Sequence, residues 1–144
     1  MVEALRMLHK TRQTAVRSKR VALQMINDQI VPAPEELRGM TRMQLTRHLV
    51  ATRPDKTAFR TPDGAARISL KHLARRYVEL DDEVSELDDA AAAILAGLAP
   101  KLIALPCVGP QTASQPMITV GDNPGRIKSE ASFAMPCGVA PIPV

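Results

Sequence analysis

Apolar residues recur at helical spacing along the first thirty positions of the chain. Residues 2–31 contain no Gly or Pro, and Val16, Leu23 and Ile30 stand seven apart, which places them on one stripe of a helix. The prolines that begin at Pro32 end this pattern, because proline cannot continue the hydrogen-bond ladder of a helix and restricts the residue before it. The pattern predicts a first long helix.

The clearest periodicity covers residues 67–98, where apolar positions alternate in steps of three and four without a gap. About four heptads of such spacing favour a coiled coil. Two partners are open for this helix: the first helix, folded back antiparallel, or the same helix of a second chain. The stripe consists of Leu70, Leu73, Tyr77, Leu80, Val84, Leu87, Ala91, Ile94 and Leu98.

Between the two long helices, the residues from about 32 to 66 predict a short helix and loops. Thr41 and Gln44 have the spacing of a capping box, which satisfies two free backbone donors where a helix begins. This short helix is expected to end near Pro54. The sequence Pro62-Asp63-Gly64 predicts a turn before the last long helix.

Composition fits helices packed along a seam better than a compact globule. Aromatic residues make up only 2% of the 144 residues, and there is no Trp, whereas large cores are usually anchored by such side chains. An all-α class follows: a long antiparallel helical hairpin or coiled coil over residues 1–98, then a small module over 99–144 with a partly disordered C-terminus.

Charge is distributed unevenly along the chain. Residues 1–76 carry sixteen Lys or Arg against six Asp or Glu, and residues 77–144 carry three against nine. A basic half and an acidic half indicate an arm that touches nucleic acid, helices that attract one another, or both. Arg17 and Arg20 are the main candidates for DNA contact, within a basic surface formed by Arg6, Lys10, Arg12, Arg17, Lys19 and Arg20.

The acidic residues and the cysteines do not predict a metal site. Cys107 and Cys137 lie thirty residues apart without a Cys-x-x-Cys pair. The carboxylates between Glu79 and Asp89 spread around a helix, so solvated surface or pairing to the basic first helix is expected. No apolar run approaches the length that crosses a bilayer, and a cytoplasmic location is expected.

The segment Leu105-Pro106-Cys107-Val108-Gly109-Pro110-Gln111-Thr112-Ala113 predicts a helix, a tight turn and a second helix. Gly109 is expected to supply a positive φ, and Pro110 suits the first position of a helix. The exposed N-terminus of that helix would bind a phosphate of the nucleic-acid backbone without reading bases. The phosphate site would consist of Gly109, Pro110, Gln111 and Thr112. A plain connection between two packed helices is the alternative.

Further motifs follow this turn: Gly121-Asp122-Asn123-Pro124, then Arg126-Ile127-Lys128-Ser129-Glu130-Ala131, and finally Cys137-Gly138-Val139-Ala140-Pro141. Their order resembles the C-terminal domain of the insertion-sequence transposases of the "one-ten" family, which are bridge-RNA-guided recombinases. The resemblance implies DNA transposition, with DNA and a structured guide RNA as partners and with self-association through the coiled coil. Arg126 and Lys128 would add positive charge beside the phosphate site, and bound protein would associate with the nucleoid.

The same resemblance implies an N-terminal domain whose acidic residues bind divalent metal, and a nucleophilic serine beyond Pro141. Neither has a counterpart in this sequence, so a truncated fragment without catalytic residues or its own cofactor is expected. Three positions depart from the family pattern: Cys107 replaces a turn glycine, and Pro116 and Pro136 fall inside expected helices, where proline costs about 3 kcal/mol. The competing hypothesis is a non-enzymatic helical structural or interaction protein.

Overall fold

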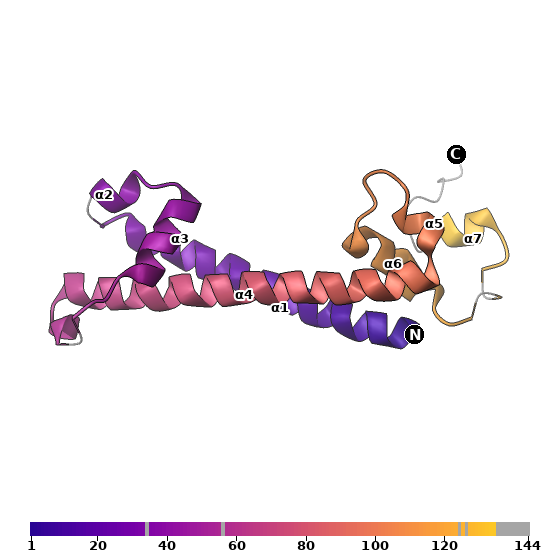
Figure 1. The fold of residues 1–144 in the computed structure, drawn as a ribbon, viewed down its shortest axis with the longest axis horizontal. Coiled ribbons are helices and arrows are strands. Elements are labelled where there is room, and N and C mark those ends of the chain that lie inside the picture. The colour runs from indigo at the N-terminus through magenta and orange to yellow at the C-terminus, as the bar shows by residue number, and fades with distance from the viewer. Residues whose placement is uncertain (34, 56, 124, 126, 135–144) are drawn as a thin grey trace, which may run out of the picture. The chain divides into compact units, whose positions relative to one another are not determined.

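The computed structural model describes residues 1–33, 35–55, 57–123, 125 and 127–134 (Figure 1). Every regular element in these residues is a helix, which confirms the predicted all-α class. The elements are α1 (Val2–Ile30), α2 (Glu35–Arg38), α3 (Arg42–Ala51), the 3-10 helix η1 (Ala58–Arg60), α4 (Pro62–Leu98), α5 (Pro100–Ile103), α6 (Pro110–Val120) and α7 (Glu130–Ala134).

The chain forms two compact units, and the helices α1 and α4 contribute to both. One unit, called here the middle unit, comprises Gln13–Val84. The other, the terminal unit, comprises Met1–Arg12 together with Ser85–Val144. The division at residue 98 into an arm and a C-terminal domain, and the coiled-coil packing of the arm, remain predictions.

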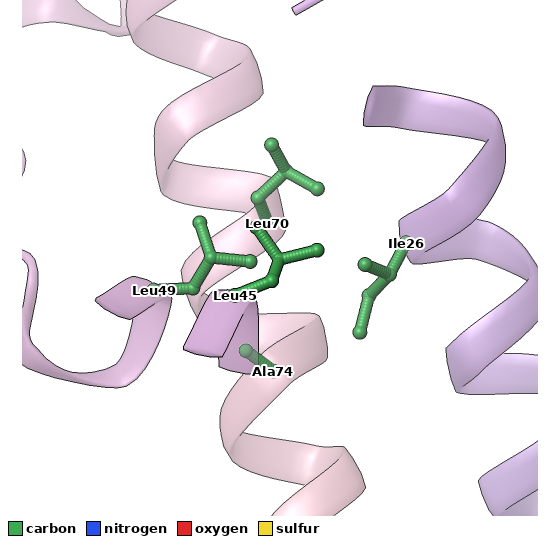
Figure 2. Close-up of a cluster of buried hydrophobic side chains, with 5 residues drawn as sticks. All are labelled: Ile26, Leu45, Leu49, Leu70 and Ala74. Carbon is green, nitrogen blue, oxygen red and sulfur yellow. The ribbon is translucent and has the colours of Figure 1, made fainter. Parts of the chain in front are cut away.

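The core of the middle unit joins three helices, as Figure 2 shows. Ile26 comes from α1, Leu45 and Leu49 from α3, and Leu70 and Ala74 from α4, and all five side chains are buried. Leu45 and Leu49 stand one turn apart, so α3 presents a single apolar edge to the two long helices. This core fixes α3 against α4 and thereby shapes the surface between them.

The predicted start of α3 is confirmed. Thr41 is its N-cap, and the hydroxyl of Thr41 and the side chain of Gln44 form the reciprocal bonds of a capping box. The helix ends at Ala51, followed by a C-cap at Thr52 in extended conformation. The short helix α2 was not predicted, because four residues are too few to show a periodicity.

The prediction of a turn at Pro62-Asp63-Gly64 is wrong, because these residues form the first turn of α4. The Gly64 N–H donates to Thr61 Oγ1 at 3.2 Å, so a threonine satisfies one of the free donors at the start of the helix. Proline is favourable in the first turn, where no intrahelical bond requires its N–H. The same residue types serve turns and helix starts, and local composition did not separate the two.

The core of the terminal unit joins α1, α4 and α6. Leu5, Ala91, Leu95 and Ala113 are buried together. In α4, the most buried residues of the two units are Leu70, Ala74 and Leu95, whereas Leu80 and Leu87 of the predicted stripe are half-buried. The predicted single helix over 67–98 is confirmed. At two places, however, the most buried residue is the neighbour of the predicted one: Ala74 in place of Leu73, and Leu95 in place of Ile94.

The helix α6 continues through Pro116 to Val120. Pro116 has no N–H to donate to the carbonyl of Thr112, so the helix loses one bond of its ladder. The interior proline therefore weakens α6 without ending it. Pro136, the other proline expected inside a helix, lies outside the described residues, as does the segment expected to be partly disordered.

Candidate nucleic-acid interface

The turn between α5 and α6 is built differently from the prediction. The Val108 N–H donates to the carbonyl of Leu105 at 3.2 Å, which closes the turn. Gly109 has φ −86° and ψ 174°, an extended conformation open to any residue, so the predicted positive φ at Gly109 is wrong. The left-handed residue is Cys107, with φ 65°. This φ suits glycine, the residue that the family resemblance implies at that position.

The first turn of α6 agrees with the prediction. Gly109 is the N-cap and Pro110 stands at the start of the helix, with no side-chain hydrogen bond to cap it. The amide N–H groups of Gln111 and Thr112 therefore have no acceptor within the helix. These donors and the positive end of the helix dipole suit an anion such as a phosphate oxygen. Gly109 and Thr112 are exposed, whereas Pro110 and Gln111 are half-buried.

Gln111 has a second role that the sequence did not reveal. Its Nε2 lies 3.4 Å from Nδ1 of His9, a buried residue of α1 in the same unit. The contact holds the Gln111 side chain against α1. The backbone N–H of Gln111, and not its side chain, is thus the group that remains suited to a phosphate.

The residues that follow α6 in the terminal unit include an acidic side chain, Asp122, and a basic one, Lys128. Asp122 Oδ1 accepts the backbone N–H of Val2 at 3.4 Å, and Asn123 Oδ1 accepts that of Gly125 at 3.1 Å. Lys128 is exposed. Arg126 lies outside the described residues, so its predicted place beside the phosphate site stays a prediction.

Several cations of the predicted basic surface on α1 are held by carboxylates. Arg12 forms a two-pronged ion pair with Asp88, in which Nη2 donates to Oδ2 at 2.9 Å. Lys19 pairs with Asp81, and Arg6 pairs with Glu3 one turn away. The expected pairing of acidic residues of α4 with the basic first helix is therefore confirmed for Asp81 and Asp88.

Lys10 is exposed, and so are the two main candidates for DNA contact, Arg17 and Arg20. Both belong to the middle unit, whereas the first turn of α6 belongs to the terminal unit. The two candidate contacts with nucleic acid therefore belong to different units, and each can be tested by itself.

A groove between α3 and α4 was not predicted. It has a volume of about 770 Å³, and its lining includes Met43 and Val50 from α3 and Tyr77 and Val78 from α4. Met43 is 72% exposed, far above the usual value for a large apolar side chain in a folded core. The signal in the sequence was the spacing of Met43, Arg47 and Val50, which defines a second stripe on α3, distinct from its buried residues Leu45, Thr46 and Leu49.

Comparison with protein-family models gave no match, and neither did comparison with curated proteins or with solved structures. Within the described residues, no three His, Cys, Asp or Glu side chains gather as metal ligands. None of the helices in that part of the chain is long and apolar enough to cross a membrane.

Proposed function

We propose that this chain belongs to an insertion-sequence transposase of the bridge-RNA-guided family, within which it binds the nucleic-acid backbone and self-associates. The family role would be DNA transposition, with a structured RNA that selects the DNA sites. A cytoplasmic location, on the nucleoid when DNA is bound, is part of the proposal. The motifs from Leu105 to Pro141 support the family, and the structure supports the backbone contact.

The observation that carries the backbone contact is the uncapped first turn of α6. Gly109 has no side chain to occupy the free donors, and Pro110 starts the helix without losing a hydrogen bond. Phosphate is the anion of nucleic acid that fits such a site, and the contact would not depend on sequence. Lys128 on the same unit and Arg17 and Arg20 on the other would add electrostatic attraction.

Fluorescence anisotropy with a labelled DNA duplex tests this function. A phosphate binder loses affinity steeply between about 50 and 200 mM salt, because binding releases condensed counterions. Gly109→Asp places a carboxylate where the phosphate would sit, and we expect weaker binding of every duplex and a smaller salt slope. Gly109→Ala is the matched control, because nothing lies within 4 Å of the position that a Cβ would take.

A non-enzymatic helical interaction protein is the second candidate function. It is favoured by the ion pairs of Arg12 and Lys19, in which part of the positive charge on α1 is already paired within the chain. On this alternative, DNA binding would be absent or insensitive to both variants at Gly109. The salt dependence of the unmodified protein and the comparison of Gly109→Asp with Gly109→Ala therefore separate the two functions.

A further inference from the structure

The groove between α3 and α4 lies wholly in the middle unit and has walls of opposite charge. The wall from α3 carries Arg42 and Arg47, both exposed. The wall from α4 carries Asp81, and the exposed Asp82 continues it, one turn after Val78. Neither arginine forms an ion pair with another residue that the structure describes. Asp81 is paired with Lys19 of the same chain, so the rim presents the two arginines along one side and the carboxylate of Asp82 along the other.

The floor of the groove is apolar and partly open to solvent. Met43, Val50 and Val78 are 72%, 37% and 38% exposed. Methionine is flexible and adapts to a partner surface. An exposed apolar strip with a charged rim is the usual layout of a protein interface, in which the rim fixes orientation and the centre supplies most of the affinity.

We propose that the occupant of this groove is the same groove of a second copy of the chain. A two-fold axis parallel to the groove would place the α3 wall of each copy over the α4 wall of the other. The arginines of one copy would then meet Asp82 of its mate, and the apolar floors would pack in the centre. In this arrangement the positively charged wall of each copy faces the negatively charged wall of the other. An arrangement that placed the two α3 walls together, or the two α4 walls together, would bring like charges into contact.

The inference rests on the self-association in the proposed function but gives it a different surface. The stripe on α4 had two possible partners, the first helix or a second chain, and Leu70 of the stripe packs with Ile26 of the first helix. Leu95, beside the stripe, packs with Leu5. Those side chains are already covered. The groove between α3 and α4 is an apolar surface of the middle unit that these contacts leave open to a second copy.

Sedimentation velocity over a wide range of protein concentration, without nucleic acid, tests the dimer. Arg47→Glu alone and Asp82→Arg alone should each weaken dimerisation at least about tenfold, because each places like charges opposite one another twice in the dimer. An equal mixture of the two variants should regain dimers, since every contact then joins opposite charges. Arg38→Glu on α2 is the matched control for the change of charge.

A monomer at every concentration would overturn the proposal, and so would a dimer that Arg47→Glu and Asp82→Arg leave unchanged. Failure of the mixed sample to regain dimers would overturn the pairing of walls. Far-UV circular dichroism confirms that each variant is folded. Because no DNA is present, failure of the backbone contact in the anisotropy assay leaves this test unaffected, and the two results are read separately.

Discussion

Arg12 on α1 holds Asp88 on α4 through two parallel contacts, with Nε donating to one carboxylate oxygen and Nη2 to the other at 2.9 Å. The side chains are only 21% and 30% exposed, so the pair lies at the edge of the helix contact and not in open solvent. Lys19 and Asp81 form a similar pair in the other unit, seven residues further along α1 and seven residues earlier on α4. In sequence, the two pairs stand seven residues apart on each helix, and their order along α4 is the reverse of their order along α1.

Breaking the Arg12–Asp88 pair should destabilise the protein. Arg12→Ala leaves a half-buried carboxylate without its partner, and we expect a loss of about 1–2 kcal/mol, below the value for a fully buried pair because solvent reaches both groups. Urea unfolding followed by circular dichroism measures it. Arg67→Ala removes the exposed pair with Asp63 and should cost less than about 0.5 kcal/mol. Equal losses in the two variants would contradict a special role for Arg12.

The left-handed backbone at Cys107 predicts a stabilising substitution. Glycine adopts φ 65° without the steric cost that a Cβ imposes, so Cys107→Gly should raise the stability by about 1 kcal/mol. Cys107→Ala keeps the Cβ and removes the thiol, and should change stability little. Thermal unfolding of both variants checks the prediction. A gain in Cys107→Ala as large as that in Cys107→Gly would assign the effect to the sulfur.

Pro116 predicts a second gain in stability. Pro116→Ala restores the N–H that the carbonyl of Thr112 lacks, and we expect stabilisation of up to about 3 kcal/mol. Pro100→Ala is the control, because Pro100 stands at the start of α5, where the missing N–H has no acceptor. Hydrogen exchange of the amides in α6 reports the change locally. Unaltered protection there would show that the surrounding packing already offsets the lost bond.

The ion pairs on α1 predict unequal roles for its cations in nucleic-acid binding. Arg20→Ala should lower the salt slope of DNA binding by about one unit, as expected for a cation that contacts phosphate. Arg12→Ala should lower it less, because Asp88 already neutralises that guanidinium. Anisotropy titrations at several salt concentrations measure both slopes. Equal slopes for the two variants would mean that the ion pair opens when nucleic acid binds.

The helices and their caps could be predicted because they depend on neighbours in sequence. The capping box of Thr41 and the break at Pro32 follow from local hydrogen bonding alone. The exchange of roles between Gly109 and Cys107 could not be predicted, since composition suggests where a turn lies but not which residue adopts the left-handed conformation.

Contacts between residues far apart in the sequence could not be predicted from the pattern of apolar residues either. Gln111 meets His9 from a position 102 residues away, and nothing near either residue indicates the other. The stripe of apolar residues on α4 predicted the buried side of the helix, but not that Ala74 and Leu95 would be its centre. Which residues of α4 are most buried depends on where α3 and α6 pack against it, and the periodicity of a single helix gives no information about that.

Tyr77 is the one tyrosine of a chain that has no tryptophan, and its ring lines the groove with the ammonium of Lys19 5.3 Å from its centre. The tyrosine fluorescence of the protein therefore originates at a single wall of this groove. Any molecule that settles there, a second copy included, would alter the polarity and quenching around that ring. The native chain thus carries its own optical reporter at this place, and binding there can be followed without a dye or an engineered label.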